Sequence, residues 1–182
     1  MSDKYTPHNP EGIYFLTLTV VEWVDLFTRR LYKEVVVDAL RHCQQHKGLE
    51  LFAWCLMPSH LHLIARAAEG YKLGPIIRDF KKFTNHAIVR LVKEGGESRR
   101  DWLLYRFEYA AKYHARVENH KMWQDGSHAM ECYSSDFIRQ KLHYIHQNPV
   151  QDGTVAEPAH YVFSSAGAYA GQPALLEVMF VE

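Results

Sequence analysis

The chain has 182 residues, of which 47% are hydrophobic and 23% charged, a composition typical of one soluble globular domain covering residues 1–182. Basic and acidic residues balance at 21 each, so the net charge gives no support to a nucleic-acid partner. The N-terminal residues are polar, and the apolar stretch Leu51–Met57 is too short to cross a bilayer, so we expect a cytoplasmic protein without a membrane partner.

The first third of the chain alternates between extended and helical patterns. Ile13–Val21 is rich in β-branched and aromatic residues and predicts a strand. Leu31–His46 carries apolar residues at helical spacing, and Gly48 predicts its C-terminal cap. Leu49–Met57 and Leu61–Arg66 predict two more strands, separated by a Pro-Ser break.

The remaining elements complete a recognisable order. Leu73–Val92 predicts an amphipathic helix, and residues 99–127 predict a helical piece followed by a loop. His128–Cys132 predicts a short strand, and Phe137–Asn148 predicts a helix that Pro149 stops. The order β-α-β-β-α-β-α predicts an α+β, ferredoxin-like (βαββαβ) antiparallel sheet with an added C-terminal helix and an irregular tail.

Basic side chains gather locally despite the neutral balance, and aromatic residues are interleaved with part of them. Such a mixture suits a single strand of nucleic acid, whose bases stack while its phosphates are neutralised. A solvated helix face with core aromatics explains the same pattern, and this feature alone favours that alternative. The candidate DNA-binding residues are Arg78, Lys81, Lys82, Arg99, Arg100, Arg106, Lys112 and Lys121.

Two histidines, His60 and His62, stand two residues apart on the third predicted strand. Residues i and i+2 of a strand point to the same face, so both imidazoles could hold one divalent ion. Further oxygen donors would be needed for a hard metal. The alternative is an ordinary pair of surface or core histidines. A structural zinc site is disfavoured, because Cys43, Cys55 and Cys132 are isolated and are expected to be reduced, buried thiols.

The last predicted helix carries Tyr144 and Asn148 four residues apart, hence on one face. The amide oxygen of Asn148 could complete a metal site with the histidine pair, which would place the Tyr144 hydroxyl beside the ion. A phenol is a poor nucleophile at neutral pH unless a cation or a base assists it. Spacing leaves other candidates open. The nucleophile could be another tyrosine, and two further histidines could be ligands or bystanders. These residues are Tyr105, Tyr109, Tyr113, Tyr133 and Tyr161, and His143 and His146.

Four segments resemble the single-tyrosine HUH transposases, and in particular their REP-associated tyrosine transposase branch. MPSHLHLIARA is similar to the family's MPNHxHLL block, and YIHQNPVQDGTV to its YIHxNPVxAGLV block. KMWQDGSH and YVFSSAGAYAG resemble its xxWQxGxH segment and its YxxSSxxxY tail. The resemblance covers roughly residues 13–171, with both main blocks in the expected order.

This resemblance implies a DNA transposase, a metal-dependent endonuclease and strand transferase that acts in DNA transposition and recombination. Its expected substrate is single-stranded DNA with REP-like hairpins, and its expected cofactor is Mg²⁺ or Mn²⁺. By matching positions, Tyr144 is the nucleophile that forms a 5′-phosphotyrosine, and His60, His62 and Asn148 are the metal ligands. Alternatives are a domesticated hairpin-binding protein with little or no catalysis and a metal-dependent hydrolase of RNA that uses water. A monomer is favoured, and a dimer that shares active sites is the alternative.

Overall fold

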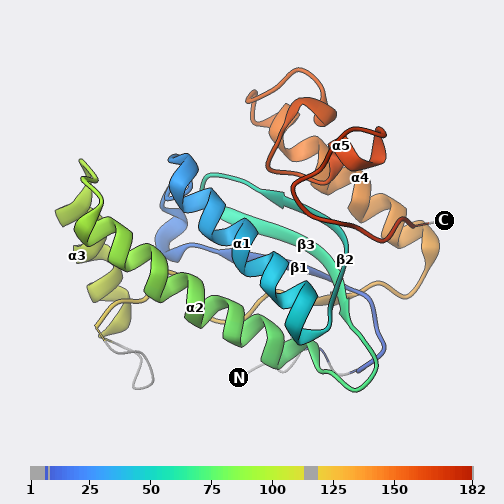
Figure 1. The fold of residues 1–182 in the computed structure, drawn as a ribbon, viewed down its shortest axis with the longest axis horizontal. Helices are drawn as coiled ribbons and strands as arrows, with labels where there is room; N and C mark the ends of the chain where they lie inside the picture. Colours follow the sequence, from blue (N-terminus) through green and yellow to red (C-terminus); the bar gives the residue numbers. More distant parts are fainter. Residues whose placement is uncertain (1–6, 8, 113–118, 182) are drawn as a thin grey trace.

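The computed structural model describes residues 7, 9–112 and 119–181. A four-stranded antiparallel sheet in the order β2-β3-β1-β4 forms its centre (Figure 1). The elements are β1 (Tyr14–Thr19), η2 (Val21–Trp23), α1 (Arg30–Lys47), β2 (Leu49–Leu56), β3 (His60–Ala67), α2 (Leu73–Glu94), α3 (Arg100–Ala111), β4 (Met130–Glu131), α4 (Ser135–Gln151), η3 (Pro158–His160) and α5 (Ala166–Tyr169). This order and topology confirm the predicted ferredoxin-like plan, with α3 inserted before β4 and α4 added after it.

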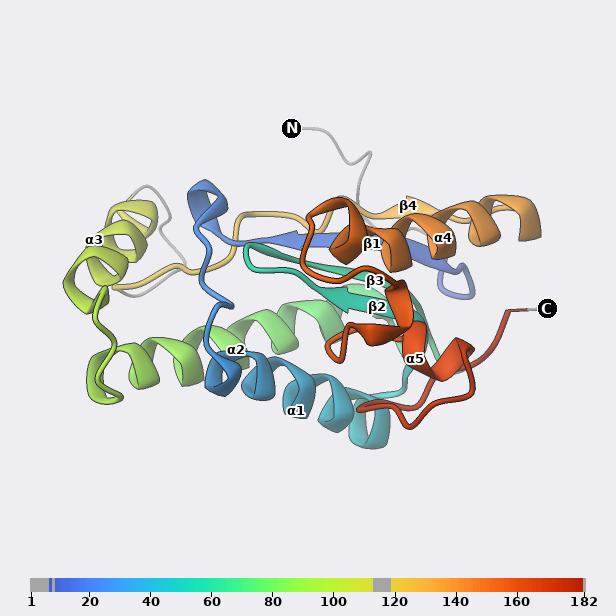
Figure 2. The same ribbon diagram turned by 90° about the horizontal axis from the view of Figure 1, so that it is seen from above.

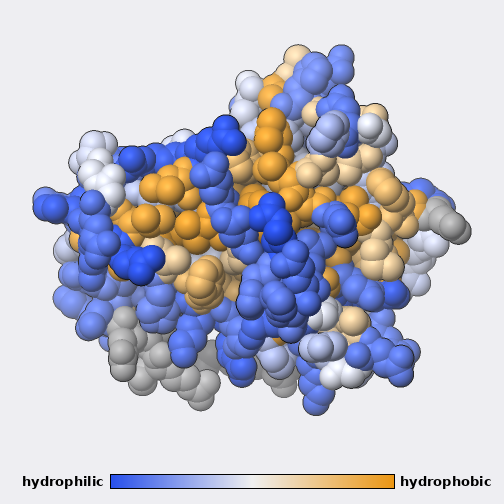
Figure 3. Space-filling model, viewed as in Figure 1, coloured by the Kyte–Doolittle hydropathy of each residue, from blue (hydrophilic) through white to orange (hydrophobic). Residues whose placement is uncertain are grey.

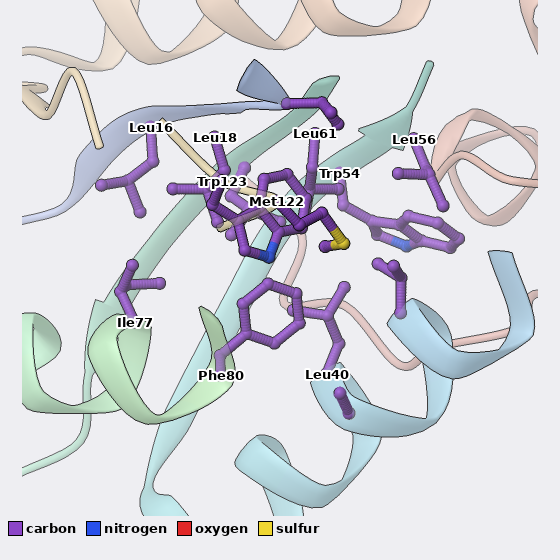
Figure 4. Packing of buried hydrophobic residues seen from close by; sticks show 14 of the residues in the cluster. Leu16, Leu18, Leu40, Trp54, Leu56, Leu61, Ile77, Phe80, Met122 and Trp123 are labelled. Carbon is purple, nitrogen blue, oxygen red and sulfur yellow. The ribbon is translucent and has the colours of Figure 1, made fainter. Parts of the chain in front are cut away.

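Helices cover the two faces of the sheet (Figure 2). On one face, α1 and α2 enclose the larger core, in which Leu40 and Phe80 point toward the sheet and the Trp123 ring lies 6.2 Å from that of Phe80 (Figure 4). On the other face, α4 packs over a smaller cluster that includes Ile145 and Phe15. Leu61 and Leu63 of β3 belong to the first core, so the intervening residues of this strand face α4.

The observed boundaries agree with most predicted elements, and Gly48 ends α1 with a left-handed φ of 68°. Two predictions were wrong in extent. Pro149 does not stop α4, which continues to Gln151; the turn closes through a bond from the Asp152 amide to the Asn148 carbonyl (2.9 Å). The fourth strand contains only two residues, because His128 adopts a φ of 40° that interrupts the extended backbone before it.

The C-terminal tail is more ordered than the predicted irregular wrap. The Leu56 amide donates to the Phe163 carbonyl (2.9 Å), and the Met179 amide donates to the Leu51 carbonyl (2.8 Å). These bonds cover the outer edge of β2, which would otherwise expose unpaired backbone groups.

On the face formed by α1 and α2, hydrophobic residues form a band across the middle, bordered by hydrophilic residues (Figure 3). The three cysteines are buried and unpaired, as the sequence predicts. Within the ranges given above, no helix has the length and apolar character needed to span a membrane.

Candidate active site

The two histidines of β3 lie together on the face of the sheet that α4 covers. His62 is only 4% exposed, and the ring centroids of His60 and His62 lie 4.6 Å apart. Both residues pair with β1, His62 opposite Thr17 and His60 opposite Thr19. The strand ladder and the buried leucines on the opposite face therefore fix the backbone from which both imidazoles project.

Hydroxyl groups orient both rings through their Nδ1 atoms. Thr17 Oγ1 lies 3.0 Å from Nδ1 of His62, and Ser59 Oγ lies 3.1 Å from Nδ1 of His60. When the proton sits on Nδ1 and is donated to the hydroxyl, Nε2 carries a lone pair. The Nε2 of His62 is buried and has no hydrogen-bond partner among the residues described. A buried nitrogen left in this state fits a bond to a metal ion.

Burial keeps the histidine pair neutral. It lowers the pKa of His62 to about 3, with smaller contributions from His60 and the ammonium of Lys141. Burial also lowers the pKa of His60. The Asn148 side chain acts in the opposite direction on both rings, which is the effect of a nearby acceptor oxygen. Both imidazoles are thus in the protonation state that metal binding requires.

The buried face of α4 determines where its polar residues point. Ile138 and Ile145 pack into the smaller core, and Tyr144 lies beside them at the rim, 43% exposed. The Tyr144 ring is 5.4 Å from that of His62. Asn148 follows one turn later, and its Nδ2 donates to the Tyr144 carbonyl at 2.8 Å, which leaves Oδ1 as an acceptor. The fold thus brings Tyr144, Asn148 and the two histidines together.

The other candidates have different surroundings. Tyr133 is 82% exposed and stacks on Phe137, and the Tyr161 hydroxyl donates to the Leu56 carbonyl (2.7 Å). His146 Nε2 lies 2.8 Å from Ser165 Oγ, a contact that joins α4 to the tail. On the surface, Tyr105 and Tyr109 form a ring pair on α3 and His143 is exposed, whereas Tyr113 lies outside the described residues.

No group of three or more His, Cys, Asp or Glu side chains that could hold a metal occurs in the described ranges. A metal site built on His60 and His62 must therefore draw on a different donor, and the amide oxygen of Asn148 is available for this.

The predicted DNA-binding residues do not surround the histidine pair, and most have partners within the protein. Arg78, Lys81 and Lys82 belong to α2, which covers the opposite face of the sheet. Burial lowers the pKa of Lys81 to about 8. The observed interactions are Arg78 with Asp79, Lys81 with the carbonyls of Gln124 and Gly126, Arg99 with the Asp25 carbonyl, Arg100 with Asp101, Arg106 with Glu22, and Lys121 with Asp125. Lys82 and Lys112 are exposed. Their role in DNA binding stays a prediction.

Three residues at the site were missed in the sequence. Lys141 Nζ lies 4.8 Å from the centroid of the Phe15 ring and 5.8 Å from that of Tyr144, and its position three residues before Tyr144 could have revealed it. Thr17 could be found only with the register of β1 against β3. Trp23, whose ring lies 5.5 Å from that of His60, carries no local signal.

A comparison of the sequence with family profiles identifies the group. The family described as "Transposase IS200 like" matches residues 13–117, which contain both histidines. The chain belongs to the IS200-like transposase family. This transposase is therefore a DNA transposase by family, as the resemblance of its motifs predicts.

One solved structure shares this fold. The structure described as a REP-associated tyrosine transposase bound to a REP hairpin has a TM-score of 0.63 at 19% identity, over 100% of this chain and 94% of that one. This likeness shows a shared fold. A protein classed as a transposase in Deinococcus radiodurans R1 has a TM-score of 0.38 at 19% identity, over 81% of this chain and 97% of that one, which is too low to show a shared fold. No curated protein sequence matches this chain.

Proposed function

We propose that this transposase cuts and rejoins single-stranded DNA beside hairpins, with Tyr144 as the nucleophile and Mg²⁺ or Mn²⁺ as the cofactor. One observation carries the proposal: the Tyr144 ring lies 5.4 Å from the ring of His62, whose buried Nε2 has no hydrogen-bond partner in the described part of the chain. A phenol next to a ligand-ready imidazole is the arrangement that metal-assisted attack on a phosphodiester needs.

The metal would be held by Nε2 of His60, Nε2 of His62 and Oδ1 of Asn148. Three protein donors leave coordination positions for a phosphate oxygen and water, as a catalytic site requires. Mg²⁺ or Mn²⁺ held there would supply positive charge against the non-bridging oxygens of the scissile phosphate. All three donors are neutral, so they would offset none of that charge.

The chain's own groups carry out the covalent step. The Tyr144 oxygen forms a bond to phosphorus, its proton passes to solvent, and the bond from phosphorus to the 3′-oxygen breaks as that oxygen takes up a proton. The products are a 5′-phosphotyrosine and a free 3′-hydroxyl. A second 3′-hydroxyl can attack the phosphotyrosine in reverse, which joins two strands and restores Tyr144 without external energy. The ammonium of Lys141 lies beside this ring and suits an adjacent phosphate.

Two further observations support the substrate and the assembly. The structure with the matching fold is described as bound to a REP hairpin, and a related DNA hairpin suits this chain as substrate. The proposed ligands and nucleophile also meet within one chain, so no second copy is needed to complete the site. A monomer is therefore the form that we propose to be active.

The test uses a pool of labelled single-stranded DNA hairpins with randomised flanks, incubated with the protein and Mn²⁺. We expect an adduct that resists denaturation and loses its label when the DNA is digested. Tyr144→Phe should abolish the adduct while hairpin retention persists, and the matched control Tyr133→Phe should leave it intact. His60→Ala or chelation should also abolish it.

Three outcomes would contradict the proposal. Cleavage that persists in Tyr144→Phe would identify water as the nucleophile. Retention of hairpins by the wild type without an adduct would identify a binding protein. Preferential cleavage of a matched RNA hairpin would identify an RNA hydrolase.

A further inference from the structure

Trp23 lies on the surface, although Val21 and Val24 in the same short segment are buried. Val21 and Val24 are each 6% exposed and belong to the large core, whereas Trp23 is 58% exposed. A tryptophan gains more than most residues from leaving water, so an indole held outside the core contributes little to folding. Its position calls for a different explanation.

The backbone that presents Trp23 is unusual. Glu22 has a φ of 53° and Trp23 a φ of 56°, in the left-handed region that residues with a side chain rarely adopt. The segment is held in this conformation from both sides: Arg106 of α3 donates to Glu22 at 2.9 Å, and the Trp23 amide donates to the Val20 carbonyl at 3.0 Å. Strained backbone of this kind clusters at functional sites.

Trp23 stands at one end of a row of four rings. Its ring centroid lies 5.5 Å from that of His60, which lies 4.6 Å from His62, which in turn lies 5.4 Å from Tyr144. The row follows β1 and β3. Tyr144 also contacts Phe15 near the start of β1, whereas Trp23 follows the end of that strand. Trp23 and Tyr144 therefore flank the histidine pair from opposite ends.

This order assigns a place to the substrate. In an in-line displacement, the attacking and leaving oxygens lie on opposite sides of phosphorus. With Tyr144 at one end of the row and the scissile phosphorus beside the histidine pair, as the proposed function requires, the departing 3′-oxygen would point toward the other end, where Trp23 lies. That oxygen belongs to the nucleotide immediately 5′ of the cleaved bond.

On the basis of the proposed function, we infer that Trp23 stacks on the base of the nucleotide immediately 5′ of the cleavage site. An exposed indole offers a flat apolar face to an unpaired base, and stacking of this kind accepts any base. The contact positions the nucleotide that carries the leaving oxygen, and it also holds the freed 3′-end near the phosphotyrosine for rejoining.

The experiment is a double-mutant cycle, with one change made in the protein and the other in the substrate. An oligonucleotide cleaved by the wild type is remade with an abasic residue immediately 5′ of the cut, and adduct formation is compared for the wild type and Trp23→Ala. We expect the abasic substitution to slow the wild type by roughly 5- to 150-fold, and to slow Trp23→Ala hardly at all beyond its own loss. Trp23→Phe should recover part of the rate. Phe83→Ala, which changes an aromatic residue 59% exposed on the opposite face, should keep the full abasic penalty.

A second readout avoids both the chemistry and the stability of the alanine variant. With 2-aminopurine at the same position, binding to Tyr144→Phe should quench its fluorescence, and the quenching should weaken when Trp23→Phe is added. An equal abasic penalty in the wild type and Trp23→Ala, or quenching that ignores Trp23, would overturn the inference alone. A wild type that forms no adduct with any oligonucleotide would overturn the proposed function and the inference with it.

Discussion

Protonation of His146 is expected to loosen the attachment of α4. The His146 ring contacts Ser165 Oγ, which donates to the Trp54 carbonyl at 3.2 Å and accepts from the Trp54 amide at 3.0 Å. This network joins α4, the tail and β2. Burial lowers the pKa of His146 to about 4, with a smaller contribution from the neighbouring His143, so the folded protein keeps this ring neutral.

The sign and size of the effect follow from linkage. A histidine in the unfolded chain takes up its proton below a pH of roughly 6.5, whereas folded His146 does so only near pH 4. The unfolded chain therefore binds more protons between these values, and acidification through this window favours unfolding. The gap corresponds to about 3 kcal/mol between pH 7 and pH 4, a large part of the roughly 5–15 kcal/mol that stabilises a domain.

Urea denaturation followed by circular dichroism, at several pH values from 7 down to 4, measures this contribution. The wild type should lose about 3 kcal/mol more over this range than His146→Gln, whose side chain does not titrate. His143→Gln changes an exposed histidine three residues away and should retain most of the wild-type pH dependence, because burial is the larger cause of the lowered pKa of His146. Equal losses in the wild type and His146→Gln would refute the reasoning, because they would show that His146 is protonated in the folded protein as easily as in the unfolded chain.

Two other substitutions test the site and the fold. Thr17→Val removes the hydroxyl that orients His62 and should weaken Mn²⁺ binding by about 10- to 100-fold in calorimetric titration; unchanged affinity would mean that packing alone holds the ring. Gly48→Ala should cost more than about 1 kcal/mol in thermal unfolding, because Gly48 has a φ of 68° and an added Cβ would lie 2.5 Å from Tyr71. Gly70 has a φ of 82°, and an added Cβ would meet nothing within 4 Å, so Gly70→Ala measures the cost of the backbone conformation alone. An equal loss of stability in the two variants would show that the contact with Tyr71 adds nothing.

The fold was predictable where local pattern and burial agree. Alternation at Leu61 and Leu63 indicated the buried face of β3, and Gly48 marked the end of α1. It was not predictable where tertiary contacts outweigh local preference. Pro149 has no amide hydrogen to donate, but its ring is buried, and the helix continues past it. The identity of residue 128 as a histidine did not indicate its positive φ, so the length of β4 could not be derived from the sequence.

The site was predictable to the extent that its residues lie on one strand or one helix. The spacing of His60 and His62 and that of Tyr144 and Asn148 each place a pair on one face. Contacts between different elements could not be predicted in this way. The approach of Thr17 to His62 depends on the register of two strands, which no single segment encodes.

The partners of the lysines and arginines could not be predicted from the sequence either. A basic residue in a sequence has no assigned partner, and several that suggested phosphate contacts are used inside the protein instead. Lys81 donates to the carbonyls of Gln124 and Gly126 at 2.6 and 2.8 Å, and Arg99 donates to the Asp25 carbonyl at 2.9 Å. Lys141, which the basic clusters did not include, is the cation that lies beside Tyr144.

The division of the site between sheet and helix has a consequence for strand transfer. His60 and His62 are fixed by the sheet, whereas Tyr144 and Asn148 share α4, whose attachment depends on Ile145 and on the His146 network. A small shift of α4 therefore moves the nucleophile and one proposed ligand together, and it changes the distance of both from the imidazoles. In the proposed reaction, cleavage and rejoining need the same alignment of phenol and phosphate, so the docking of α4 on the sheet would set the geometry of both steps.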